Sequence, residues 1–423
     1  MKAFFKITFL ICFLLFSCEE DPAPTVYEGN IIVRHPHSWR TNTNKIGISA
    51  IEDQMSFNGY ILVPNSTNTI AKMNLNNGEI VNEVDYFNKD IIDIYDIHKY
   101  QNKAIIMDGW HNACLNMETM EFEWVKERHS QFERIWEWNS GIEDHFFLFA
   151  MPRGMGDTTN HRYRGCYVGD IHTGEIELLF FPDLGELPEP YPIDAFNTNV
   201  GGVQWIEPLR DPKSKDIFLI VYSSKQYKTI EGQISQDYMG LYNFSKREWI
   251  YARVPLGRTS DIHGRPIIEN GRIYHTLFAH IDCRDLYTGE IIWRVTDSVY
   301  HSPSGFCMND DKIIIFEEGH DKAVAAYFKN SGSLAWRTPS HGSVSLMTEL
   351  NDVVYFTSTG DGRLHALDAN TGEYLWRLYS PEEFETPRGN FLWSCYAFPG
   401  EYGEKGKIIA NSYYSILCYE AIR

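Results

Sequence analysis

Short stretches in which hydrophobic and polar residues alternate recur along most of the chain, separated by turn residues. The clearest stretch, residues 352–378, reads DVVYFTSTGDGRLHALDANTGEYLWRL. It holds three alternating runs, with a glycine turn after the first and an Asn-Thr-Gly turn before the third. Alternation with a period of two predicts β-strands, and these turn residues favour tight reversals between strands. We therefore expect an all-β chain.

This pattern repeats with a period near forty residues. Residues 270–295 and 311–338 align with the first stretch, and Trp249, Trp293, Trp336 and Trp376 are spaced by 44, 43 and 40 residues. Four short strands in such a period predict a β-propeller, with each tryptophan packed between neighbouring sheets. We expect one propeller of four-stranded blades, eight in number, with seven as the alternative. The third strands of the eight units begin near Ala71, Ala113, Cys166, Met239, His280, Val324, Leu364 and Ser415.

The last unit, near residues 407–419, lacks an outer strand. The segment Gly29–Arg34 is our candidate for this strand, because pairing it there would close the ring and remove its open sheet edges. The propeller domain is then 29–423, with no boundary inside it.

Residues 1–17 are predicted to be a lipoprotein signal peptide. Lys2 and Lys6 precede an apolar run that is too short to span a bilayer comfortably. Leu15-Phe16-Ser17-Cys18 resembles a bacterial lipobox, which implies lipid (palmitate) on Cys18 and a tether over 18–28. The acidic run 19–21 resembles the export signal of surface lipoproteins. We expect an outer-membrane lipoprotein exposed at the cell surface, with a periplasm-facing protein as the alternative.

Charge and cysteine content narrow the class of partners. The chain has 38 Lys and Arg against 57 Asp and Glu, a net charge of −19, which becomes −21 once the signal is removed. This acidity excludes general nucleic-acid binding, which needs a basic face. The six cysteines after Cys18 form no CxxC pair and are scattered like strand positions, so we expect mostly free, buried thiols. We expect a monomer.

The irregular insertions fall on one face of the predicted ring, near residues 152–165, 181–199 and 223–237. Long loops on a rigid scaffold commonly carry function. Histidine and arginine gather in these loops of an otherwise acidic chain, which predicts a locally positive cleft for an anionic ligand. The candidate substrate-binding residues are Arg153, Arg164, Arg388, Trp136, Trp205 and Trp393.

Three histidines of the fifth unit could bind a zinc ion. His275 and His280 flank a short hairpin connection, and His263 precedes the same blade. Three imidazoles with Cys283 as a fourth ligand would make a structural Zn²⁺ site. Regular strand alternation argues against Cys283, because it would point away from His280. Two exposed histidines beside a turn are the alternative. We expect no organic cofactor.

The repeats resemble those of the quinoprotein-dehydrogenase-like propeller superfamily, since Ala366, Asp368, Thr371, Gly372 and Trp376 fit its A-x-D-x-x-T-G-x-x-x-W pattern. The chain is also similar in a few spacings to β-propeller ulvan lyases, whose Tyr–Arg pair Tyr242 and Arg258 would match. This resemblance implies β-elimination on a sulfated, uronate-containing polysaccharide, in which an Arg neutralises the carboxylate and a Tyr or His moves the C5 proton. The candidates for the family's catalytic histidines are His129, His145 and His161; His129 and Tyr238 suit the cleft face better than His145 and Tyr242.

Two other functions remain open. The lipobox and repeats are equally similar to the propeller subunit of the outer-membrane protein assembly machinery, a non-enzymatic scaffold. A quinone-dependent dehydrogenase is the third hypothesis, although the adjacent cysteine pair of many such enzymes is absent. Of the three, we favour the polysaccharide lyase.

Overall fold

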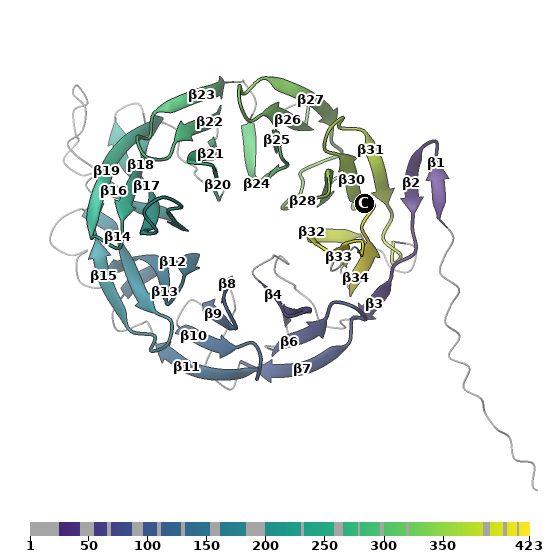
Figure 1. Cartoon of the computed structure of the whole chain (residues 1–423), viewed down its shortest axis with the longest axis horizontal. Helices are drawn as coiled ribbons and strands as arrows, with labels where there is room; N and C mark the ends of the chain where they lie inside the picture. The colour runs from purple at the N-terminus through teal and green to yellow at the C-terminus, as the bar shows by residue number, and fades with distance from the viewer. Residues whose placement is uncertain are drawn as a thin grey trace, which may run out of the picture.

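The protein is a ring of β-sheets in a computed structural model (Figure 1). The residues described are 25–42, 55–65, 69–86, 96–107, 111–127, 132–152, 161–182, 199–229, 232–257, 265–277, 280–296, 300–318, 321–383, 390–400, 404–412 and 414–423. Their regular secondary structure is β-strand, and none of them belongs to a helix long and apolar enough to cross a membrane.

Apart from two N-terminal strands, the strands form eight units of four, and in most units the first strand lies nearest the ring axis (Figure 1). Blades one and two are β4 (Ser56–Phe57), β5 (Tyr60–Asn65), β6 (Thr69–Asn74) and β7 (Ile80–Asp85), then β8 (Asp96–Tyr100), β9 (Lys103–Met107), β10 (His111–Asn116) and β11 (Glu121–Glu127). Blades three and four are β12 (Phe132–Ile142), β13 (His145–Pro152), β14 (His161–Asp170) and β15 (Ile176–Phe180), then β16 (Asn199–Arg210), β17 (Ile217–Thr229), β18 (Gly232–Asn243) and β19 (Glu248–Gly257).

Blades five and six are β20 (Ile267–Glu269), β21 (Arg272–Leu277), β22 (His280–Asp285) and β23 (Ile291–Thr296), then β24 (Tyr300–Met308), β25 (Lys312–Glu318), β26 (Ala323–Phe328) and β27 (Leu334–Pro339). Blade seven is β28 (Thr348–Leu350), β29 (Val353–Thr357), β30 (Leu364–Asp368) and β31 (Tyr374–Leu378). Blade eight is β32 (Phe391–Phe398), β33 (Lys407–Ser412), β34 (Ser415–Glu420) and, from the N-terminus, β3 (Trp39–Asn42). The predicted all-β propeller with eight four-stranded blades is confirmed in the described residues.

An N-terminal strand completes blade eight, but the predicted segment was wrong. β3 pairs with β34, with Trp39 opposite Cys418 and Asn42 opposite Ser415. The segment proposed for this role instead contains β2 (Ile31–Arg34), which pairs in parallel with β31 of blade seven and carries β1 (Val26–Glu28) on its outer edge. β1 therefore lies within the range predicted to be a tether.

Residue chemistry explains why β3 is the closing strand. The sequence Trp39-Arg40-Thr41 repeats Trp336-Arg337-Thr338 of the blade-six outer strand. Trp39 donates a hydrogen bond to the carbonyl of Leu75 at 3.0 Å, as Trp336 does to that of Ala369 at 2.9 Å. β2 has an aliphatic run in place of the tryptophan, so it lacks the indole that packs on the next blade and donates a hydrogen bond to it.

Four outer-strand tryptophans pack on the turn between the third and fourth strands of the following blade: Trp39, Trp124, Trp293 and Trp336. At the blade-six turn, Gly332 has a φ of +70°, and a Cβ added there would lie 2.6 Å from the Trp293 ring. Only glycine combines this backbone conformation with room for the indole. Trp249 was predicted to be the packing tryptophan of blade four, but it lies beside Tyr242 and Phe180. Tyr251 makes the contact with the next blade instead, since its hydroxyl donates to Leu286 O at 3.0 Å.

Trp376 lacks such a turn, because the outer strand of blade eight comes from the N-terminus. The N-terminal segment packs there in its place, with the His35 ring 5.4 Å from the Trp376 ring and Ile32 against the same core cluster. Residues 25–42 therefore hold the outer edges of blades seven and eight together.

The connections divide into two faces. The loop face carries the connections between second and third strands, such as 358–363, and those between blades, such as 340–347. The turn face carries the tight third-to-fourth-strand turns, such as 369–373. On the loop face, the predicted irregular insertion 223–237 is largely a long hairpin, since β17 and β18 stay paired from Ser223–Tyr238 to Thr229–Gly232. β14 and β16 also pair in parallel there and join blades three and four.

Candidate functional site

Four arginines occupy equivalent positions in four consecutive blades. Each follows the blade tryptophan in an outer strand and lies opposite the second or third residue of the neighbouring third strand, near the loop face. We call these residues the arginine row: Arg294 in blade five, Arg337 in blade six, Arg377 in blade seven and Arg40 in blade eight. Their side chains are 24–36% exposed.

A more deeply buried carboxylate holds each arginine of the row. The four contacts are Arg294 Nε to Asp282 Oδ1 at 2.6 Å, Arg337 Nε to Glu317 Oε2 at 2.7 Å, Arg377 Nη2 to Asp361 Oδ2 at 3.5 Å and Arg40 Nη2 to Glu382 Oε1 at 2.9 Å. The carboxylate side chains are 0–17% exposed. In each pair the arginine is therefore more exposed to solvent than the carboxylate. The buried carboxylate fixes the direction of the guanidinium.

Blade five adds two histidines and a tyrosine to its ion pair. Tyr222 Oη of blade four lies 2.9 Å from His275 Nδ1, and His275 Nε2 lies 3.5 Å from Asp282 Oδ2. His280 Nε2 is 3.8 Å from the same oxygen. Arg284 donates to Asp282 at 2.7 and 2.9 Å. This cluster lies on the blade-five face turned toward blade four.

Burial and charge set the protonation states in this cluster. Burial lowers the pKa of His275 and lowers that of His280 to about 4, so both imidazoles are neutral at pH 7. Burial also opposes ionisation of Asp282, but the hydrogen bond from Arg294 and the contact with His275 outweigh it and hold the Asp282 pKa far below its ordinary value. The cluster therefore holds an ionised carboxylate between two guanidiniums.

Blade seven carries a second histidine–carboxylate pair. His365 is fully buried, and its Nε2 lies 3.0 Å from Asp361 Oδ1. Its ring stacks on Phe356 at 5.0 Å and lies nearly parallel to the His341 ring at 6.4 Å. Burial lowers the His365 pKa, so this ring is also neutral at pH 7.

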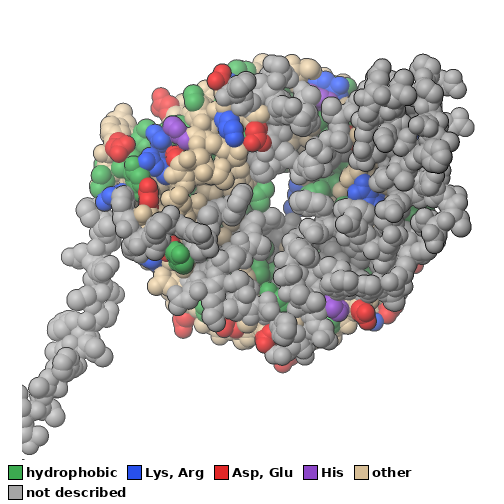
Figure 2. Space-filling view, turned by 180° about the vertical axis from the view of Figure 1, so that it is seen from behind, with side chains coloured by type: hydrophobic (Ala, Val, Ile, Leu, Met, Phe, Trp, Pro, Cys, Tyr) green, Lys and Arg blue, Asp and Glu red, His purple; other side chains and the backbone are tan. Residues whose placement is uncertain are grey.

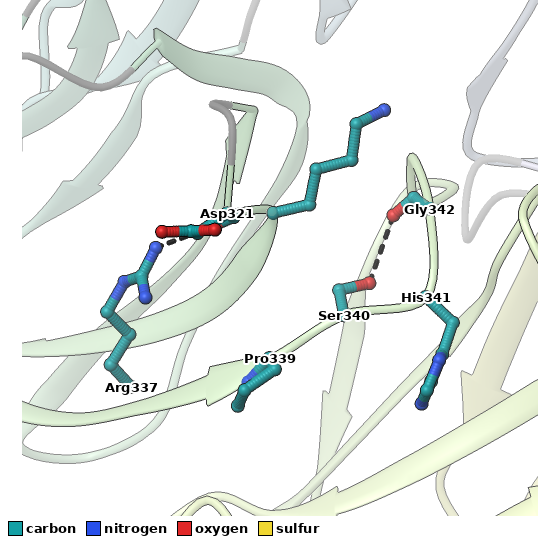
Figure 3. Close-up of a pocket in the computed structure, with 7 residues that line it drawn as sticks. Asp321, Arg337, Pro339, Ser340, His341 and Gly342 are labelled. Carbon is teal, nitrogen blue, oxygen red and sulfur yellow. Dashed lines mark hydrogen bonds between the residues drawn. The ribbon is translucent and has the colours of Figure 1, made fainter.

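A shallow cavity of about 650 Å³ lies on the loop face, between blade six and the connection that leads from it to blade seven. Figure 3 shows Arg337 and Asp321 on one side of it and Ser340, His341 and Gly342 on the other. Arg337 Nη2 donates to the backbone carbonyl of Asp321 at 2.6 Å, and Ser340 Oγ donates to that of Gly342 at 3.0 Å. One member of the arginine row thus lines a cavity that a ligand or a partner side chain could enter.

Of the predicted zinc ligands, His275 and His280 both approach Asp282, and Cys283 does not join them. Cys283 faces away from His280, as strand alternation indicated, and packs with Tyr274 and Trp293 against blade six. Asp282 lies beside the two histidines instead, and its carboxylate already accepts hydrogen bonds from Arg284 and Arg294. No group of three His, Cys, Asp or Glu side chains in the described part of the chain is arranged to hold a metal ion. His263 lies outside the described residues.

The described members of the predicted catalytic set lie at opposite ends of their strands. Tyr242 is near the turn-face end of β18 and is buried between Phe180 and Trp249. His145 begins β13 at the same face and contacts the Phe244 ring at 5.0 Å. His161 begins β14 at the loop face, nine residues or roughly 30 Å from the end of that strand.

The structure therefore does not bring Tyr242 and His145 together with His161. Arg258 and His129 lie outside the described residues. Gly257, which precedes Arg258 and ends β19, pairs with Asp237, five residues along β18 from Tyr242.

Two predicted substrate-binding residues are buried. Arg164 lies in β14 at the junction with β16, where burial lowers its pKa to about 10. Trp205 belongs to the core cluster between blades four and five. Trp136 and Trp393 lie in β12 and β32, whose backbones alone are described there, and Arg153, Arg388 and Cys18 lie outside the described residues.

Sequence reasoning missed the arginine row, Tyr222 and Asp282. The Trp-Arg dipeptide, repeated four times at equivalent positions, was a sufficient signal for the row. Period-two alternation also places Asp282 on the same face as His280. Nothing in the sequence pairs Tyr222 with His275, since that contact crosses between two blades.

Figure 2 shows that acidic and basic side chains are interspersed around the ring, so the net acidity is not gathered on one side of the view.

Comparison with known proteins finds a family match in part of the chain and solved β-propellers with the same fold. The family model of the outer membrane protein assembly factor BamB matches residues 277–392, about a quarter of the chain. No curated protein matches the chain in sequence.

Solved structures with the same fold include BamB from Moraxella catarrhalis, with a TM-score of 0.55 and 12% identity over 90% of this chain and 100% of that one. Quinohemoprotein alcohol dehydrogenase ADHIIG from Pseudomonas putida HK5 gives a TM-score of 0.60 and 9% identity over 91% and 76%. Sqt1 from Saccharomyces cerevisiae gives 0.58 and 10% over 92% and 100%. At these identities the similarity establishes the fold alone.

Proposed function

We propose that this protein is a non-enzymatic scaffold, anchored to the outer membrane by lipid on Cys18, that binds an acidic segment of a partner protein on the arginine row. The observation that carries the proposal is the presence of fixed, partly exposed guanidiniums in four consecutive blades. Three of them, Arg294, Arg337 and Arg377, fall within the region that matches the assembly-factor family model.

Physical chemistry supports an acidic partner. A guanidinium whose direction is already fixed loses little conformational freedom when it binds a carboxylate, and it offers two parallel N–H donors. Consecutive blades repeat this donor along an arc of the loop face, so one extended acidic segment can contact several of them. A buried carboxylate already matches the charge of each guanidinium, so the row would recognise an acidic segment through directed hydrogen bonds and not through a net positive field.

Removing both members of a pair tests the scaffold without leaving a buried charge. We expect Glu317→Gln with Arg337→Leu, combined with Asp361→Asn and Arg377→Leu, to reduce partner recovery by cross-linking in intact cells at least tenfold, which corresponds to about 1.4 kcal/mol. The measurement is quantitative mass spectrometry of the cross-linked products. Lys126→Leu with Glu175→Gln, a pair exposed on other blades, is the matched control and should leave recovery unchanged. Equal recovery from the two variants would contradict the proposal.

A polysaccharide lyase is the second candidate, and the Tyr222–His275 pair favours it. A tyrosine hydroxyl 2.9 Å from an imidazole, with Arg294 nearby, contains the residue types that uronate β-elimination requires. The base would take the C5 proton, the C4–O bond would break as a C4=C5 double bond forms, and the leaving oxygen would take a proton from the acid of the pair. The substrate would be a sulfated, uronate-containing glycan such as ulvan.

The lyase has a direct assay. If the second candidate holds, ulvan or another uronate glycan should gain the ultraviolet absorbance of an unsaturated uronate, and Tyr222→Phe should lower that rate by about 10²–10⁴-fold. Circular dichroism of the variant checks that it remains folded. Absence of the signal across a panel of anionic glycans would eliminate this candidate and leave the scaffold, and an unchanged rate in Tyr222→Phe would exclude the Tyr222–His275 pair as its site.

A further inference from the structure

The first described residues are fixed to the outer rim of blade seven. β2 pairs with β31, and Tyr379 N donates to Val33 O at 3.0 Å. Further along, Ser38 N donates to Cys418 O at 2.7 Å at the edge of blade eight. Thr25, the first described residue, lies 3.3 Å (Oγ1 to Nδ1) from His35. Figure 1 shows β1 and β2 outside the ring, beside β31.

Chain length limits how far this rim can lie from a lipid on Cys18. Six residues lie between Cys18 and Thr25, and the seven steps between the two Cα atoms cover at most about 3.6 Å each, or roughly 25 Å in all. Three strand spacings of about 4.8 Å make each four-stranded blade roughly 14 Å wide, so opposite rims of the ring are at least about 30 Å apart. β1 and β2 add roughly 10 Å on the blade-seven side. The rim of blade three therefore lies beyond the reach of this tether.

The charge of the protein gives a bilayer no reason to hold either face. The chain carries a net charge of −19, and residues 19–21 beside the anchor are acidic. Anionic lipid headgroups attract clustered Lys and Arg, whereas the arginine row is matched by buried carboxylates. Attachment at one rim is then the main constraint on orientation.

We propose that the bilayer faces the outer rim at blades seven and eight, so that the ring stands away from the membrane with both faces accessible. This rests on the lipid attachment that forms part of the proposed function. It adds that the arginine row lies beside the membrane surface and not under it. A partner anchored in the same membrane could then reach the loop face laterally.

Energy transfer from the protein to labelled vesicles tests the orientation. Lipidated protein would be placed on phosphatidylethanolamine–phosphatidylglycerol vesicles that carry an acceptor dye on their headgroups. Single donor dyes would be attached at Tyr27→Cys on β1, Ile292→Cys on β23 and Leu178→Cys on β15, all exposed positions. The six free cysteines of the described chain are buried, so labelling should be selective. Glu373→Cys in the blade-seven turn replaces Tyr27→Cys if that variant does not fold.

We expect transfer to be largest at position 27, intermediate at 292 and smallest at 178, with at least a threefold difference between the extremes. Equal transfer at the three positions would mean that a face lies on the bilayer, and this would overturn the proposal, as would the reverse order. Failure of the protein to float with the vesicles would remove the anchor and overturn it as well. The outcome is independent of partner recovery, so failure of the scaffold function is seen separately.

Discussion

Trp39→Ala should lower the free energy of unfolding of the propeller by about 3–5 kcal/mol, the range for removing a buried tryptophan. The indole is 7% exposed and packs with Ile61, Met73 and Ile409 between blades eight and one. Its Nε1 also donates to Leu75 O at 3.0 Å. Because β3 is the N-terminal strand of the last blade, this side chain joins the two ends of the ring. Guanidinium denaturation followed by circular dichroism measures the loss.

Two controls separate ring closure from general hydrophobic packing. Tyr27→Ala removes a side chain that is 60% exposed on β1 and should change stability little. Trp293→Ala makes the equivalent change inside the continuous chain, where the indole donates to Lys329 O at 2.9 Å. Both tryptophan variants should lose stability, but Trp39→Ala should also speed hydrogen exchange in β3 and β34. A loss below about 1 kcal/mol for Trp39→Ala would show that another contact closes the ring.

The repeat could be predicted from the sequence because every blade packs between two neighbouring sheets and needs the same kinds of residue at the same positions. Period-two alternation, the turn glycines and one aromatic residue per outer strand recur wherever a sheet must pack between two others. The eight third strands and the free, buried cysteines were predicted for this reason, and each described cysteine lies in a different core cluster. The closing strand was missed since hydrophobicity alone favoured residues 29–34, while the deciding signal was the match of Trp39-Arg40-Thr41 to blade six.

The site was less predictable because its contacts join residues that no local pattern relates. Tyr222 meets His275 across a blade boundary, and Glu382 meets Arg40 across more than 340 residues of sequence. Tyr242 and Arg258 match a family spacing along the chain. Their distance in space, however, depends on how β18 and β19 pair, and not on the number of residues between them. Sequence spacing therefore predicted residue types better than it predicted which residues share a face.

Asp282→Asn should destabilise the protein by about 3–5 kcal/mol, the cost of removing one partner from a buried ion pair. The carboxylate is fully buried and accepts two hydrogen bonds from Arg284 and two from Arg294, at 2.6–2.9 Å. Arg284 is only 2% exposed, so the amide would leave a buried cation without a counter-charge. Equilibrium denaturation at pH 7.5 measures the difference.

The pH dependence of that difference identifies its electrostatic origin. The Asp282 pKa is lower in the folded protein than its ordinary value of 3.8, so its contribution is fully present above about pH 5 and is lost as the pH falls toward the folded-state pKa. The gap between wild type and Asp282→Asn should therefore narrow below about pH 4. Adding Arg284→Met and Arg294→Met should recover stability, because no buried cation then remains unpaired. A gap that persists unchanged at pH 3, or no recovery in the triple variant, would assign the loss to packing instead of charge.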